Sequence, residues 1–117
     1  MKAHVRAAAA AIALAHALGR TVSNVYDYEA GGYKRISATV SGNSVNAYDY
    51  DSGCHISGGL PSLYHYGEGA HLQLNANGSG TYSGFDYDTS SHFSISVNGN
   101  QAQIFDYGEG SYFTYSV

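Results

Sequence analysis

Five aromatic triplets, each with a polar residue at its centre, are the part of this chain best equipped for chemistry. Their carboxylate, imidazole and phenol groups could transfer protons or bind a metal ion. The triplets are Tyr26-Asp27-Tyr28, Tyr48-Asp49-Tyr50, Tyr64-His65-Tyr66, Phe85-Asp86-Tyr87 and Phe105-Asp106-Tyr107. Their starts fall 22, 16, 21 and 20 residues apart, a period too short for a repeated helical hairpin but suited to two short strands with two turns. The triplets therefore predict a structural repeat before they predict a reaction.

Most histidines of the repeat region fall at one fixed position, so their spacing shows whether they could share a metal ion. The sixth residue after each triplet centre is His or Tyr, and these residues are Tyr33, His55, His71, His92 and Tyr112. In a meander, equivalent positions of successive repeats lie two strands apart, roughly 9.6 Å. Zinc ligands lie about 2 Å from the ion. We therefore expect this column of residues to be structural and predict no metal site there.

Acidic residues near the turns offer a second, weaker possibility of metal binding. Residues 49–53, Asp-Tyr-Asp-Ser-Gly, resemble the start of a calcium loop, and residues 86–88 partly repeat it. The further oxygen ligands and the distal Glu of a full loop are missing. An Asp just before a turn can instead accept hydrogen bonds from the turn amides. We expect such capping, and the weak calcium candidates are Asp49, Asp51, Asp86 and Asp88.

Motifs of known catalytic chemistry are absent from the sequence. There is no Gly-x-Ser-x-Gly, no His-Glu-x-x-His and no phosphate-binding loop. Asp, His and Ser are frequent, but no local sequence context joins them into a catalytic group. We predict that the protein is not an enzyme and has no cofactor.

The chain between the triplets predicts strands and tight turns. In the last copy, Phe93, Ile95 and Val97 alternate with serines, which is the pattern of a half-buried strand. Asn98-Gly99 follows, and this dipeptide between two such runs is a strong hairpin signal. Gly- or Asp-rich turns follow the triplets. We expect an all-β fold, an antiparallel meander of about ten short strands built from two-strand repeats of about 20 residues. The sheet could form a barrel, a sandwich or an open sheet.

The aromatic residues of the triplets should lie on one face of this sheet. The outer two residues of a triplet point to one side of a strand, and the central residue points to the other. The aromatic face would consist of Tyr26, Tyr28, Tyr48, Tyr50, Tyr64, Tyr66, Phe85, Tyr87, Phe105 and Tyr107. Aliphatic residues such as Val45, Ala47 and Ile104 occupy the opposite face. We expect either burial of both faces or an exposed aromatic strip, and an exposed strip could bind sugar rings or another copy of the sheet.

Residues 1–19 differ in composition from the rest of the chain. Lys2 and Arg6 precede an apolar run at residues 7–18, and small residues lie at its end. This layout is typical of a secretory signal peptide and predicts a secreted or cell-surface protein. The alternative is a retained Ala-rich helix, because Ala is the best helix former. The run of 12 residues is too short to span a bilayer, which needs about 20. We expect residues 20–117 to form a single β-repeat domain.

The charge of the chain argues against nucleic acid as a partner. Charged residues make up 12% of the sequence, about half the usual share. Without residues 1–19, three Lys or Arg remain against nine acidic residues, a net charge of −6. Phosphate binding needs clustered Lys and Arg, so we predict no nucleic-acid partner. Cys54 is the only cysteine, which excludes an intramolecular disulfide. In a secreted chain it would be a free thiol or form an intermolecular link, but we expect a small, partly buried side chain that fills space.

The order of triplet, Gly-rich turn, alternating strand and Gly-Asn turn resembles short uncharacterised bacterial proteins built from tandem hairpins. The resemblance covers residues 25–117 and implies no established activity. The third copy departs from the pattern, because His65 replaces Asp and the Gly-Asn turn is lost. We expect a bend, a corner or a sheet edge near Pro61.

The two ends of the repeat region complement each other. Residues 25–28 and 112–117 are the two halves of one repeat unit, so they could pair within one molecule and close a barrel. They could also pair between molecules and form a fibre. Our leading prediction is a non-enzymatic structural protein, secreted or on the cell surface, that self-associates through its terminal strands. The alternative is a glycan-binding module that uses the Tyr-rich face.

Overall fold

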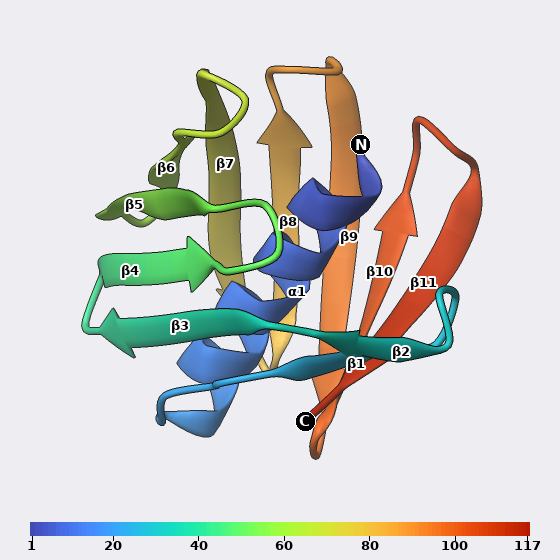
Figure 1. The fold of residues 1–117 in the computed structure, drawn as a ribbon. Coiled ribbons are helices and arrows are strands. Elements are labelled where there is room, and N and C mark those ends of the chain that lie inside the picture. Colours follow the sequence, from blue (N-terminus) through green and yellow to red (C-terminus); the bar gives the residue numbers. More distant parts are fainter.

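The computed structural model describes residues 1–117 as one helix and one antiparallel sheet (Figure 1). Helix α1 covers Ala3–Leu18. The strands are β1 (Val25–Asp27), β2 (Gly32–Lys34), β3 (Ile36–Ser41), β4 (Ser44–Asp49), β5 (Cys54–Gly59), β6 (Ser62–His65), β7 (Ala70–Gly78), β8 (Thr81–Asp86), β9 (Ser91–Asn98), β10 (Gln101–Asp106) and β11 (Ser111–Ser116). From β3 to β11, each strand pairs with the next one along the chain. The predicted antiparallel meander is therefore confirmed, with eleven strands because Arg35 separates β2 from β3.

The sheet curls into a nearly closed barrel, because its first strand pairs with its last. Tyr26 of β1 lies opposite Ser116 of β11, and Asp27 lies opposite Tyr115. At the seam of the barrel, Val22 and Ala38 of β3 form a bridge whose two backbone N···O distances are 2.9 and 2.8 Å. Of the predicted arrangements, the barrel is the one observed. The complementary half-repeats at the two ends pair within one molecule.

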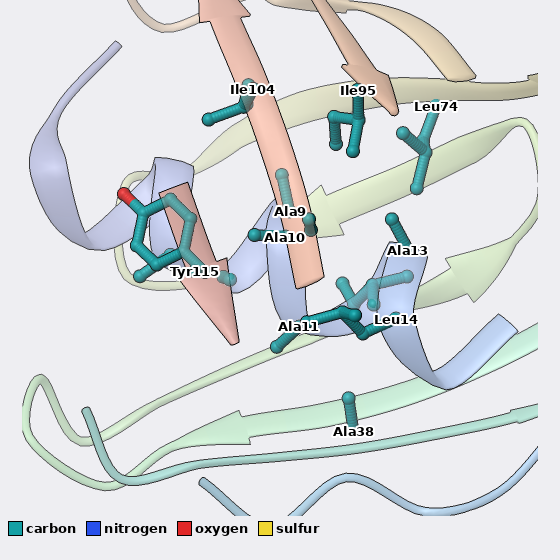
Figure 2. Close-up of a cluster of buried hydrophobic side chains, with 14 of the residues drawn as sticks. Ala9, Ala10, Ala11, Ala13, Leu14, Ala38, Leu74, Ile95, Ile104 and Tyr115 are labelled. Carbon is teal, nitrogen blue, oxygen red and sulfur yellow. The ribbon is translucent and has the colours of Figure 1, made fainter. Parts of the chain in front are cut away.

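Helix α1 runs through the inside of the barrel and supplies much of its core. Residues 7–15 of the helix are completely buried, and their side chains are Ala except for one Ile and one Leu. Figure 2 shows Ala9 and Ala10 among residues from several strands, including Ile95 and Ile104. A helix that is apolar on all sides is stable only when it is enclosed. Small alanine side chains let the surrounding sheet approach the helix backbone from every direction.

The dimensions of helix and barrel match. Sixteen residues at 1.5 Å per residue give a helix of about 24 Å, and the molecule measures 29 × 28 × 28 Å. The helix ends at Gly19, whose left-handed backbone (φ 66°) lets its N–H donate to the Ala15 carbonyl oxygen. The chain then turns back to Val22 at the seam of the barrel.

The segment whose layout is typical of a signal peptide is therefore the core helix of this structure. Eleven of the 29 residues in the main hydrophobic cluster lie at positions 1–15. The chain has no helix with the length and apolar character needed to cross a membrane.

The irregular third copy lies inside the sheet and not at its edge. β6 has only four residues, but it pairs with β5 on one side and β7 on the other. The Pro61 carbonyl oxygen accepts a hydrogen bond from the Leu74 N–H at 2.8 Å, although Pro61 itself cannot donate. Of the three outcomes expected near Pro61, a sheet edge is wrong.

Candidate functional site

The central residues of the five triplets lie inside the barrel, all at the same end. They close strands β1, β4, β6, β8 and β10, and none is more than 3% exposed. Oδ1 of each of the four aspartates accepts a hydrogen bond from the backbone N–H two residues later, at 2.9–3.0 Å. In the third copy, His65 Nδ1 accepts a similar bond from the N–H three residues later, that of Glu68, at 3.2 Å. The predicted capping of the turns is confirmed.

The four weak calcium candidates do not converge on one point. Asp49 and Asp86 are buried inside the barrel and bind their own turns. Asp51 binds Arg35 through both oxygens, each at 3.0 Å from a nitrogen, and these hydrogen bonds hold its pKa below the usual value. Asp88 lies 3.3 Å from Lys2 Nζ. No group of three His, Cys, Asp or Glu side chains has metal-binding geometry in the structure.

The helix begins at the end of the barrel where these buried acids lie. Arg6 Nη1 lies 3.3 Å from Asp106 Oδ2, and the Met1 nitrogen lies 3.1 Å from the same oxygen. Lys2 and His4 both contact Glu68, and the hydrogen bond from Lys2 is the main cause of a lowered pKa at Glu68. The positive end of the helix dipole adds to these cations. Buried carboxylates and the helix N-terminus therefore stabilise each other.

His65 should make the stability of the barrel depend on pH. Burial, and secondly the neighbouring His4, lower its pKa below 6.5, while Glu68, Asp49 and Asp86 act in the opposite direction. As pH falls through 6.5, His65 therefore becomes protonated in the unfolded chain while it stays neutral in the folded protein. The free energy of unfolding decreases as a result. We expect the melting temperature to fall between pH 7.5 and about 5 in the parent protein and much less in His65→Asn.

The matched control for this experiment is His71→Asn, because His71 is exposed on the outside of the barrel. That variant should keep the pH dependence of the parent. If the pH dependence of the melting temperature decreased equally in His65→Asn and His71→Asn, its assignment to His65 would be contradicted.

Cys54 is buried, as the sequence favoured, and burial raises the pKa of its thiol. A Cβ added at Gly67 would lie 2.7 Å from its Sγ. The cysteine therefore fills a tight space beneath the turn after β6.

The outer residues of the triplets form aromatic clusters on the outside of the barrel. In each copy, the first triplet aromatic packs edge-to-face against the second and also against the residue of the His/Tyr column. For Phe85, the ring centroids of Tyr87 and His92 lie at 4.8 and 4.7 Å. The exposed tyrosines are Tyr28, Tyr33, Tyr50, Tyr66, Tyr87, Tyr107 and Tyr112, which are 53–71% accessible. The aromatic strip is thus exposed, which was one of the two predicted outcomes.

Three of these clusters are linked in the same way to the next copy. The backbone N–H of Tyr66 donates to the His55 carbonyl oxygen at 3.0 Å. Tyr87 and His71 form the equivalent bond at 3.2 Å, and Tyr107 and His92 form it at 3.0 Å. We call these units the His–Tyr pairs: His55–Tyr66, His71–Tyr87 and His92–Tyr107. The histidine column predicted from the spacing therefore has a partner, a tyrosine of the following triplet.

Two adjacent grooves lie at the second and third His–Tyr pairs. The larger groove has a volume of 510 Å³ and is lined on its outer side by Gln73, Asn75, Ser83, Phe85, His92, Ser94 and Tyr107. The smaller groove, of 200 Å³, includes Ser62, His71, Gln73 and Tyr87. Gln73 of β7 lines both grooves. Sequence reasoning identified the aromatic residues but missed Gln73, Asn75 and the two serines, because only the register of β7, β8 and β9 brings them together.

The strands around these grooves carry no charged side chain on their outer face. Within β3–β11, the only Asp, Glu, Lys or Arg residues are Asp49, Asp86 and Asp106, and all three are buried. The outward positions hold Ser, Thr, Asn, Gln, His and aromatic residues. In the sequence, the absence of charge within the strands corresponds to uncharged polar residues at alternate positions.

Fold and wall together define an all-β protein, a nearly closed antiparallel barrel around a central helix with aromatic clusters outside. No family model matches the chain, and no curated protein or solved structure matches it significantly. The resemblance to tandem-hairpin proteins therefore stays a prediction.

Proposed function

We propose that the protein is a non-enzymatic module that binds uncharged carbohydrate in the larger groove of its outer wall. The observation that supports this function most directly is the lining of the groove, where aromatic rings stand beside amide and hydroxyl groups without any charge. Sugar rings present apolar C–H faces and hydroxyl groups that both donate and accept. The Gln73 and Asn75 amides can likewise donate and accept. The volume of 510 Å³ lies within the range of small-ligand sites.

The buried acids of the triplets support a non-enzymatic function. Their Oδ1 atoms already bind turn amides, and they lie inside the barrel, away from the groove. General acid–base catalysis needs a side chain within hydrogen-bond reach of the ligand. The groove holds no carboxylate, and in this proposal its His92 and Tyr107 bind the ligand.

Replacing Tyr107 by Ala should weaken carbohydrate binding about tenfold, because an aromatic contact of about 1.4 kcal/mol is lost. The matched control is Tyr112→Ala. Both tyrosines pack against Phe105 at 4.7 Å and have similar exposure, 61% and 64%, but only Tyr107 lines the groove. Binding should be screened on an array of neutral glycans and measured by calorimetry on the best ligand. Equal losses in both variants, or no binding across the array, would contradict the proposal.

Self-association is the second candidate function, and the seven exposed tyrosines favour it. The terminal strands, through which we predicted fibre formation, are already paired with each other in one molecule. At the seam, Lys34 and Arg35 add charge of the kind that discourages edge-to-edge pairing. An association through the tyrosines is expected to appear as a concentration-dependent size in chromatography and as filaments in electron microscopy. A monomer at high concentration would exclude it.

A location outside the cell would suit a carbohydrate-binding protein. Such a location stays a prediction, which rests on the signal-peptide-like order of basic, apolar and small residues in residues 1–19. Because the same segment fills the barrel, we infer that it remains in the folded protein. Mass spectrometry of the protein from its native source would test this inference directly. A mature chain that begins near residue 20 would contradict it.

A further inference from the structure

We propose that the ligand is a linear polysaccharide whose chain crosses the strands and occupies both grooves at once. This inference rests on the proposed function and specifies it. A single groove would suit a terminal sugar equally well. The repetition of the groove along the wall points to a ligand that repeats too.

The two grooves are built to the same plan. Each contains a histidine of the column and the tyrosine of the next triplet, joined by the backbone hydrogen bond of a His–Tyr pair. His71 lies on β7 and His92 lies on β9, so equivalent atoms are two strands apart. The strand spacing contributes roughly 9.6 Å to their separation. The register adds a shift of two residues along the strands, because Phe85 lies opposite both Gln73 and His92. A ligand that uses both pairs must therefore present similar groups at a similar interval, as a polymer of repeating sugar units does.

Gln73 connects the two grooves. Its side chain is half-buried on β7 and lines both, so its amide can donate to a sugar unit in one groove and accept from a unit in the other. Across β7–β8, Gln73 lies opposite Phe85, which is the central ring of the aromatic cluster in the larger groove. Polar recognition and aromatic contact thus alternate along the direction that crosses the strands.

The wall also indicates which polysaccharides are excluded. No cation lies within β3–β11 to neutralise a carboxylate or a sulfate group, and the protein is acidic overall. An anionic polymer would be repelled by the net charge and would find no Lys or Arg in the grooves to neutralise it. The ligand is therefore an uncharged chain.

Occupying both grooves at once converts the second contact into an intramolecular event, which raises affinity without a new type of contact. We expect affinity to rise at least about tenfold from a disaccharide to an oligomer that reaches both grooves, and then to level off. The probes are length series of unbranched neutral oligosaccharides derived from cellulose, laminarin and amylose, from disaccharide to hexasaccharide. Binding is measured by calorimetry.

Variants separate the two grooves. His71→Ala should lower the affinity of the hexasaccharide to that of the disaccharide and leave disaccharide binding nearly unchanged, since His71 lines the smaller groove and does not line the larger one. His55→Ala is the matched control, because His55 is the exposed histidine of the first His–Tyr pair and lines neither groove. Thermal melting confirms that each variant is folded.

The outcomes distinguish this inference from the proposed function. A disaccharide that binds as tightly as the hexasaccharide would overturn the linear ligand and leave a single-unit carbohydrate site. Unchanged hexasaccharide binding in His71→Ala would overturn it as well. No binding by any of the neutral series would overturn both proposals.

Discussion

Replacing Ala10 by Asp is expected to unfold the protein, whereas the same replacement at Ala3 should leave it folded. Ala10 is completely buried in the middle of α1, and strands enclose the helix (Figure 2). A carboxylate there has no cation partner and no route to water. An uncompensated buried charge costs several kcal/mol, and the whole free energy of unfolding of a domain is about 5–15 kcal/mol. We expect a loss of at least about 4 kcal/mol.

Ala3 is a suitable control because it lies on the same helix but is exposed. An Asp in the first turn is also favoured by the helix dipole. Circular dichroism during heating should show a cooperative transition for the parent and for Ala3→Asp, and a strongly lowered or absent one for Ala10→Asp. A common melting temperature for the two variants would show that α1 is not the core of the folded protein in solution.

The second large effect concerns the ion pair that joins the helix to the barrel. Asp106 is completely buried, and its Oδ2 lies 3.3 Å from Arg6 Nη1. The guanidinium group also stacks over the Phe113 ring at 3.7 Å, and the Arg6 side chain is only 8% exposed. Asp106→Asn removes the negative charge but keeps an oxygen that can cap the turn at Gly108. We expect a loss of about 3–5 kcal/mol, because the positive charges of Arg6 and of the Met1 nitrogen, 3.1 Å from the same oxygen, then stay buried without this counter-ion.

Asp86→Asn is the matched control for this variant. Asp86 has the same position in the repeat and the same bond to its turn, and its other oxygen accepts only from the Thr89 hydroxyl at 3.1 Å. No cation forms a salt bridge with it. We expect a loss of about 1 kcal/mol there, as for one hydrogen bond. Urea titrations monitored by tyrosine fluorescence would compare the two. Equal losses would mean that the Arg6–Asp106 pair gives no net stability beyond its turn cap.

Local patterns were sufficient to predict the sheet. Alternation around Ile95 and the dipeptide Asn98-Gly99 act over a few residues, so strand and turn positions follow from the sequence. Capping by the triplet Asp residues is equally local, since the bonded N–H lies two residues away.

The role of the helix could not be predicted from residues 1–19 alone. A short apolar, Ala-rich run has the same composition in a signal peptide and in an enclosed helix. What distinguishes the two is the space inside a barrel formed by residues far along the chain, such as Ile104 and Tyr115 (Figure 2). The pairing of the half-repeats at the two ends was likewise ambiguous, because the sequence of a strand is the same whether its partner belongs to the same molecule or to another one.

Only the aromatic part of the candidate site could be predicted from the sequence. The aromatic residues could be identified because they repeat along the sequence, and the structure confirms that they share an exposed face. Gln73, Asn75 and Ser83 resemble any solvated residues when taken singly. They form part of the groove only because of the register between β7 and β8, which places Gln73 opposite Phe85 and Asn75 opposite Ser83.

The pairing of β1 with β11 has a consequence for the order of events in folding. Every other strand pair that builds the sheet joins neighbours along the chain, so those hairpins can form early from local contacts. The β1–β11 ladder joins residues some 90 positions apart and completes the wall around α1. The residues of α1 are enclosed by this wall in the folded protein. We therefore expect the strands to assemble around the helix and the β1–β11 ladder to form late.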